Sequence, residues 1–224
     1  MKSAKIVLLG PGAVGKTSLV RRFVDAKFSE DYISTIGTVT YKKEVETDKG
    51  DVKFMIWDIH GQKQNSRLHA VNYAGSRGAL VVYDSTRKST FNELKGWIDD
   101  LYNVVGKVPT IVVGNKYDLL KEFESDTEIK LADVKNSQDL GQKFNTWMRE
   151  KNSNIVEFFR KNYPRDFESL VFEPVTYWQS TKFVKRDLEK EFGMSIPYYV
   201  SSAKTGKNVE TAFKKLAELI LEDW

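Results

Sequence analysis

The sequence contains no cysteine, and this absence excludes several kinds of chemistry. Without a thiol, the chain can form no disulfide, no thiolate zinc site and no cysteine nucleophile. It also offers no residue for prenylation or palmitoylation, and Lys2 stands where myristoylation requires glycine. The composition agrees with a reducing compartment, and we expect a cytoplasmic protein.

Long apolar runs are also missing. No run approaches the roughly 18–20 residues of a membrane-spanning helix, and the first apolar run, Ile6–Leu9, has only the length of a strand. We therefore expect membrane contact only through a partner or through a tail that this sequence does not contain. The net charge of +4 is small and its 35 basic residues are dispersed, so we expect no nucleic-acid partner. We also expect a monomer.

Short β-rich runs alternate with amphipathic helical patterns along most of the chain. Continuous apolar runs at Ala79–Asp84 and Thr110–Asn115 are typical of strands covered on both faces. Two further runs flank the turn signal Asp48–Gly50 and predict a hairpin. This alternation predicts a mostly parallel α/β sheet that binds ligands at the carboxyl ends of its strands. The other predicted elements are strands at 5–10 and 198–202 and helices at 16–25, 89–105 and 208–221.

The segment Gly10–Thr17 (GPGAVGKT) fits the phosphate-loop motif G-x-x-x-x-G-K-[ST]. It follows a predicted strand and opens a predicted helix, which is the context that the motif requires. Glycine lets the amides from Gly12 to Lys16 turn onto phosphate oxygens. The Lys16 ammonium reaches the β and γ phosphates, and the Thr17 hydroxyl supplies one Mg²⁺ ligand. The sequence therefore predicts a nucleotide phosphate site.

The segment Asn115–Asp118 (NKYD) identifies the base. The Asp118 carboxylate can accept hydrogen bonds from N1 and N2 of guanine, whereas adenine lacks this pair of donors. The Lys116 stem can lie along the base, and the Ala203 amide in SSAKTG (Ser201–Gly206) can donate to guanine O6. The order of these motifs predicts guanine specificity. An ATPase, for which Asp118 would be incidental, is the alternative.

With these motifs in this order, the chain resembles the small GTPases of the Ras superfamily, and the Rab branch most closely, over about residues 4–118 and 181–222. The resemblance implies the P-loop GTPase fold, with a six-stranded, mostly parallel sheet, one antiparallel strand and helices on both faces. It also implies a GTP/GDP switch that hydrolyses GTP slowly without an activating protein, in trafficking or signalling. The alternative is a GTP-binding interaction module with little or no hydrolysis.

The resemblance also assigns the nucleotide and metal ligands. In YISTIG (Tyr32–Gly37), Thr35 would bind Mg²⁺ only in the GTP state, and Phe28 would stack on guanine. The metal set is then Thr17, Thr35 and, through a water, Asp58. The nucleotide set is Gly12, Ala13, Val14, Gly15, Lys16, Thr17, Ser18, Phe28, Tyr32, Thr35, Gly61, Asn115, Lys116, Asp118, Ser202, Ala203 and Lys204.

The same resemblance assigns catalytic roles to Gln62 and Lys16. Gln62 would orient the attacking water and the Gly61 amide would contact the γ-phosphate. His60 is a departure from similar proteins, which usually have alanine there. Its imidazole could bind the phosphate, displace Gln62 or point away, so a catalytic role stays open. An activating protein, an exchange factor and effectors would bind at Tyr32–Gly37 and Gly61–Tyr73.

Residues from about 120 to about 180 interrupt the strand–helix alternation within the single domain 1–224. Apolar side chains recur at helical spacing from Ser137 to Asn162, which predicts one or two amphipathic helices. We interpret the segment as a helical insertion packed on the sheet, and a binding surface is the alternative. We expect an ordered helical lobe that does not contribute to the nucleotide site.

Overall fold

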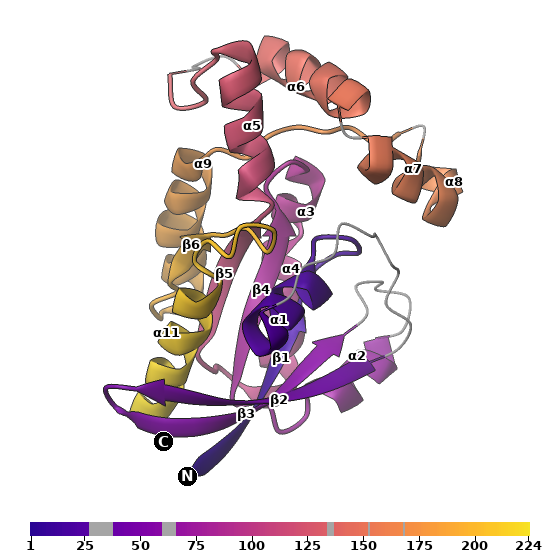
Figure 1. The fold of residues 1–224 in the computed structure, drawn as a ribbon. Helices are drawn as coiled ribbons and strands as arrows, with labels where there is room; N and C mark the ends of the chain where they lie inside the picture. The colour runs from indigo at the N-terminus through magenta and orange to yellow at the C-terminus, as the bar shows by residue number, and fades with distance from the viewer. Residues whose placement is uncertain (27–37, 60–65, 134–136, 152, 168) are drawn as a thin grey trace.

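The computed structural model describes residues 1–26, 38–59, 66–133, 137–151, 153–167 and 169–224 (Figure 1). Six strands form one sheet in the order β2-β3-β1-β4-β5-β6. The pairing is parallel throughout, except that β2 and β3 are antiparallel. This confirms the predicted fold class. The strands are β1 (Lys2–Leu9), β2 (Thr38–Thr47), β3 (Gly50–Ile59), β4 (Gly78–Asp84), β5 (Thr110–Asn115) and β6 (Tyr198–Val200).

The predicted hairpin joins β2 to β3. Gly50 at its turn has a φ of +116°, a backbone conformation that glycine adopts without strain. β3 then pairs in parallel with β1, and Asp58 lies opposite Leu8. This register brings the end of β3 beside the point where β1 enters the phosphate loop.

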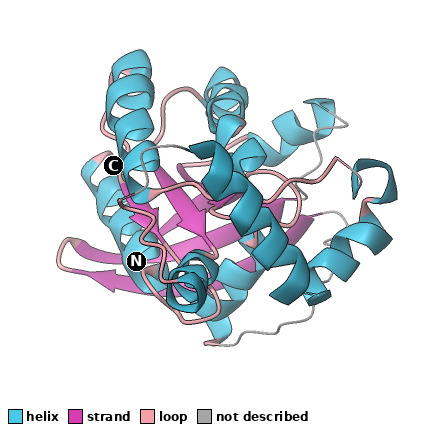
Figure 2. Cartoon of the chain, turned by 90° about the horizontal axis from the view of Figure 1, so that it is seen from above, coloured by secondary structure: helices cyan, strands magenta, loops and turns pink. Residues whose placement is uncertain are grey.

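Helices cover both faces of the sheet (Figures 1 and 2). On one face, α1 (Lys16–Asp25) and α11 (Val209–Glu222) share a core cluster with apolar side chains of the strands. Phe23 of α1 stacks on Phe213 of α11 with ring centroids 4.0 Å apart. The helix predicted for 208–221 packs here through one apolar face, on which Phe213, Leu216, Ala217 and Ile220 are all buried. Each such large side chain contributes about 1.5–3 kcal/mol through burial.

The opposite face carries a second core cluster. Trp97 and Leu94 are fully buried there and pack with apolar side chains of β1, β4 and β5. The single helix predicted for 89–105 is interrupted at Glu93, which caps both halves. The helices of this face are α2 (Ser66–Tyr73), α3 (Lys88–Asn92), α4 (Leu94–Val105) and the continuous α9 (Tyr177–Lys182), η1 (Phe183–Leu188) and α10 (Glu189–Phe192), of which η1 is π-helical.

The insertion forms helices with a core of their own. Its helices are α5 (Tyr117–Thr127), α6 (Ser137–Lys151), α7 (Ser153–Asn162) and the short α8 (Pro164–Phe167). The Phe123 ring lies 4.9 Å from that of Phe144 and 5.5 Å from that of Trp147, and all three belong to a third core cluster. These aromatic side chains therefore pack on each other in this cluster. Among the residues that the structure describes, no helix is long and apolar enough to cross a membrane.

Candidate nucleotide site

The phosphate loop connects β1 to α1 and depends on two glycines. Gly10 has a φ of +133° and Gly15 a φ of +93°, and both values favour glycine. A Cβ at Gly10 would collide with the carbonyl oxygen of Val82 in β4, and one at Gly15 would collide with the Asn115 side chain. The two glycines therefore let the loop lie directly on the carboxyl ends of β4 and β5.

Lys16 points into the curve of this loop. Its ammonium donates to the carbonyl oxygens of Gly10 at 2.7 Å and Pro11 at 2.8 Å. Burial lowers the pKa of Lys16 to about 8, although the Asp58 carboxylate acts in the opposite direction. Phosphate oxygens are stronger acceptors than neutral carbonyls, so the ammonium is placed to exchange one set of partners for the other.

Thr17 and Asp58 meet at the edge of the loop. The Thr17 hydroxyl, in the first turn of α1, donates to Oδ2 of Asp58, whose carboxylate is fully buried near the end of β3. Magnesium is commonly held by one or two protein oxygens together with substrate phosphates and waters. In the described ranges no three His, Asp or Glu side chains cluster into a metal site. The hydroxyl and carboxylate therefore fit an Mg²⁺ ion that relies on phosphate oxygens for its other ligands.

Asn115 ties the three predicted motifs together. Its side-chain nitrogen donates to the carbonyl oxygen of Val14 at 2.9 Å, and its side-chain oxygen accepts from the Ala203 amide at 3.1 Å. The Tyr117 amide adds a backbone hydrogen bond to Ser201 at 3.0 Å. The phosphate loop, NKYD and SSAKTG therefore converge at the carboxyl edge of the sheet, where a ligand site was expected.

Two further residues predicted for the base site, Asp118 and Ser202, are also described. Asp118 is half-buried in the first turn of α5, and Ser202 is buried beside Ala203. Arg22 of α1 donates to the carbonyl oxygens of Ala203 at 2.8 Å and Lys204 at 2.6 Å, which fixes the loop after β6 against α1. This arrangement leaves the Asp118 carboxylate as a candidate for the guanine edge.

Asp84, at the end of β4, is a site residue that motif reasoning missed. Its Oδ2 lies 2.8 Å from Lys116 Nζ and 2.9 Å from Arg87 Nε. Burial opposes ionisation of Asp84, but the two cations more than offset it and hold the pKa of its carboxyl well below the usual range. The signal was present in the sequence, since a carboxylate ends the apolar run Ala79–Asp84 beside the strands that carry the motifs. Asp84 holds the Lys116 ammonium in place.

The insertion contacts the phosphate loop at Gly12. A Cβ placed on Gly12 would lie 2.6 Å from the hydroxyl oxygen of Tyr163, and Ala13 packs against the insertion core. Arg87 donates to the Gly12 carbonyl oxygen at 3.0 Å, and its guanidinium lies 4.6 Å from the Phe159 ring centroid. The expectation of a lobe apart from the nucleotide site is therefore wrong, because the end of α7 reaches the loop. Helical periodicity shows which face is apolar, but not which neighbour that face meets.

Other predicted residues fall into two groups. Ser18 is half-buried in α1, directly after Thr17. The switch residues with predicted roles in binding or catalysis lie outside the described residues, so the structure does not place them. These are Phe28, Tyr32, Thr35, His60, Gly61 and Gln62.

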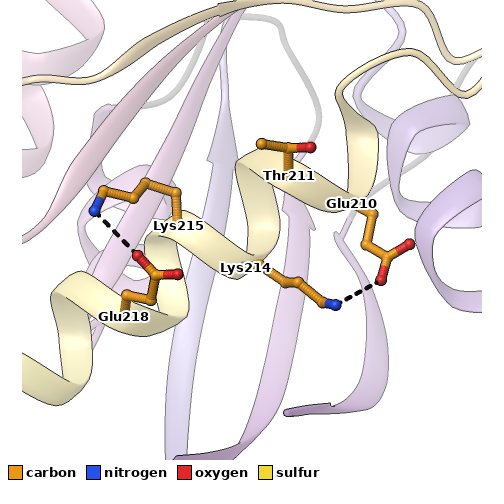
Figure 3. A pocket seen from close by; sticks show the side chains of 5 residues that line it. All are labelled: Glu210, Thr211, Lys214, Lys215 and Glu218. Atoms are coloured by element: carbon orange, nitrogen blue, oxygen red, sulfur yellow. Dashed lines mark hydrogen bonds and ion pairs between the residues drawn. The ribbon is translucent and has the colours of Figure 1, made fainter. Parts of the chain in front are cut away.

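A surface hollow on α11 is unrelated to this site (Figure 3). Lys214 pairs with Glu210 at 3.0 Å, and Lys215 pairs with Glu218 at 3.0 Å. All of its lining residues, which also include Thr211, come from this one helix. Ion pairs along an exposed helix are typical of a solvated surface and contribute little stability.

The fold and the converging motifs define a P-loop GTPase domain, and comparison with known proteins agrees. The sequence model of the Ras family matches residues 5–167. Ras-related protein Rab-21 of Mus musculus is 34% identical over 159 residues, which cover 70% of each chain. GTP-binding protein YPTM1 of Zea mays is 33% identical over 156 residues, which cover 69% of this chain and 74% of its own. The chain belongs to the Ras family and is a GTP-binding small GTPase close to the Rab branch.

Proposed function

We propose that the chain acts as a GTP/GDP switch with slow intrinsic GTP hydrolysis. The observation that carries the proposal is the position of Asn115, whose side chain bonds Val14 in the phosphate loop and Ala203 in the base loop. A phosphate site and a base site joined through one buried side chain suit a single nucleotide that spans both.

The base end of this site is selective for guanine. The Asp118 carboxylate accepts from guanine N1 and N2, and the Ala203 amide donates to O6. The Lys116 stem lies along the base while Asp84 holds its ammonium at 2.8 Å. Adenine would leave the Asp118 carboxylate without its donors, so ATP is a poor competitor.

The phosphate end combines the loop amides with a metal position. Lys16 exchanges its carbonyl partners for β- and γ-phosphate oxygens, which bind an ammonium more strongly. Thr17 would hold Mg²⁺ directly, Asp58 would hold it through a water, and Thr35 would join them in the GTP state. The chemistry supplied by bound Mg²⁺ is neutralisation of charge on the phosphate oxygens.

Hydrolysis depends on positioning rather than on covalent chemistry. Gln62 orients the attacking water and the Gly61 amide contacts the γ-phosphate. We expect His60 to slow the unaided reaction, which suits a switch that waits for an activating protein. That protein, an exchange factor and effectors act at Tyr32–Gly37 and Gly61–Tyr73.

The cellular setting follows from the relatives. Rab-21 proteins and YPTM1 are named as Ras-related or GTP-binding proteins, and the Rab resemblance suggests a role in membrane trafficking. We place the switch in the cytoplasm, where the absence of cysteine is compatible with a reducing environment. Contact with membranes would then come through a partner or an additional tail.

Two measurements test this function. Displacement of labelled GDP by unlabelled guanine and adenine nucleotides tests base selectivity, and equal displacement by ATP would contradict it. Single-turnover hydrolysis of GTP tests the switch. A chain that binds GTP tightly but releases no phosphate over many hours would instead be an interaction module, which is the alternative function.

A further inference from the structure

We infer that the insertion is a built-in positioning element for the phosphate loop, which acts on Gly12 through Tyr163 and Arg87. In this arrangement, the retention of GTP depends on the insertion more strongly than the retention of GDP. The inference rests on the proposed function, because it concerns the same nucleotide site.

Gly12 lies in the part of the loop that borders the terminal phosphates. In this motif the lysine ammonium reaches the β and γ phosphates. Here Lys16 Nζ lies against the carbonyl oxygens of Gly10 and Pro11, the two residues directly before Gly12. A contact that fixes Gly12 therefore acts at the γ-phosphate end of the site, which GDP leaves empty.

Arg87 holds Gly12 from the side of β4. Its guanidinium donates to the Gly12 carbonyl oxygen at 3.0 Å and to Asp84 at 2.9 Å, and it lies over the Phe159 ring. Arg87 is only 6% exposed, so these contacts are largely removed from water, where hydrogen bonds and cation–π contacts are stronger than at the surface. One side chain thus joins the sheet, the phosphate loop and the insertion.

The Tyr163 hydroxyl lies beside Gly12 on the side of the insertion, since a Cβ on Gly12 would lie 2.6 Å from it. The Tyr163 amide donates to the Phe159 carbonyl oxygen at 2.9 Å, and the Tyr163 ring lies 5.6 Å from that of Phe159 and 6.0 Å from that of Phe158. These contacts fix the position of the ring, and the ring brings its hydroxyl to Gly12. The insertion core therefore determines where this hydroxyl lies.

The chain that leaves the insertion is anchored beside Arg87. The Val175 amide donates to Ser85 at 2.8 Å, and the Lys88 amide donates to Glu173 at 3.1 Å. The Lys88 ammonium also pairs with the Glu173 carboxylate at 2.6 Å. These backbone hydrogen bonds thus attach the end of the insertion to the segment that carries Arg87. A movement of the insertion would therefore also move this segment.

Two substitutions separate this role from general stability. Tyr163→Phe removes only the hydroxyl, and Arg87→Lys keeps the charge but loses the planar set of donors. Release of a fluorescent non-hydrolysable GTP analogue and of fluorescent GDP is measured for each full-length protein in the presence of Mg²⁺. We expect release of the GTP analogue to accelerate about three- to tenfold relative to release of GDP in each variant.

Trp147→Phe is the matched control. Trp147 lies in the same insertion core and donates a hydrogen bond to Asp126. Phenylalanine keeps an aromatic ring in the core and loses the bond to Asp126, so Tyr163 should stay in place and the ratio of the two release rates should stay unchanged. An unchanged ratio in Tyr163→Phe and Arg87→Lys, or an equal change in the control, would overturn the inference.

A measurement without nucleotide separates this inference from the proposed function. Amide hydrogen exchange of the nucleotide-free protein should be faster across the phosphate loop in Tyr163→Phe than in the wild type. Identical exchange in the two proteins would overturn the inference by itself. A wild-type chain that retains neither nucleotide would instead refute the proposed function, whatever the exchange shows.

Discussion

The side-chain nitrogen of Asn115 lies 2.9 Å from the carbonyl oxygen of Val14 and donates a hydrogen bond to it at the carboxyl edge of the sheet. Asn115 is 2% exposed, so water can hardly replace this bond. The same side chain accepts from the Ala203 amide. The relative position of the phosphate loop and the base loop therefore depends on one amide group.

Substitution of Asn115 by alanine should destabilise the protein even without nucleotide. It leaves the Val14 carbonyl and the Ala203 amide without their partner, at about 1–3 kcal/mol for each buried polar group. Urea unfolding of the nucleotide-free protein measures the loss. Asn103→Ala, at an exposed position in α4, is the control and should change the free energy of unfolding by less than about 0.5 kcal/mol. Equal stability of the two variants would contradict this prediction.

Asp118→Asn should change the preferred base. The amide no longer accepts from both guanine N1 and N2, so we expect a severe loss of affinity for GTP and GDP. Xanthine carries a carbonyl at C2 that suits an amide donor, so affinity for xanthine nucleotides should increase. Calorimetric titration with GDP and xanthosine diphosphate tests both changes. An unaltered affinity for GDP would remove Asp118 from the base site.

Nucleotide affinity should fall as the pH rises above about 8, because burial lowers the pKa of Lys16 to about 8 in the nucleotide-free protein. Bound phosphates favour the charged ammonium and raise its pKa. Below pH 8, Lys16 is protonated both before and after nucleotide binding. Above pH 8, Lys16 must take up a proton when the nucleotide binds. Calorimetry in two buffers of different ionisation enthalpy should show this uptake at pH 9 and a smaller one at pH 6.5. Equal heats of binding in the two buffers at pH 9 would refute the coupling of nucleotide binding to protonation of Lys16.

Gln62→Leu should slow GTP hydrolysis without weakening GTP binding. A residue that only orients the attacking water stabilises the transition state and not the ground state, so we expect a loss of about one to several powers of ten in rate. Single-turnover phosphate release together with GTP affinity measures both effects. Hydrolysis at the wild-type rate in this variant would exclude Gln62 as the residue that positions water.

His60→Ala distinguishes crowding from catalysis. If the imidazole crowds Gln62, its removal should raise the hydrolysis rate, and this is the result that we expect. If the imidazole instead donates to the γ-phosphate or the water, its removal should lower the rate. The wild-type rate would then also vary with pH near the ordinary histidine pKa of about 6.5.

The sequence predicts the sheet and the converging motifs well, for physical reasons. Buried parallel strands are nearly continuous apolar runs, so the segments now seen as β4 and β5 were recognisable. Each motif also follows a strand, and parallel strands bring their carboxyl ends to one edge. The pairing of Asn115 with Val14 was nevertheless not predicted, because adjacency of two motifs does not determine which atoms meet.

The features that the sequence did not predict depend on tertiary contacts. The break at Glu93 separates α3 from α4 although the helical pattern continues across it. Nothing in the sequence distinguishes Arg87 from an arginine on the surface. In the structure, however, Arg87 is buried between Asp84 and Phe159. Neither local propensity nor periodicity reports such neighbours. The roles of His60 and Gln62 stay predictions, since both lie outside the described residues.

The separate core of the insertion has a consequence for how the chain folds. β6 can pair with β5 only after the long segment 116–197 has closed into a loop, and contacts so distant in sequence form slowly. Clusters such as Phe123, Phe144 and Trp147 are local and can form first. A collapsed insertion shortens the effective loop, although the entropic gain is only about 0.6 kcal/mol for each halving of loop length. During synthesis, the insertion would thus assemble while β6 and α11 are still in the ribosome, and the sheet would be completed last.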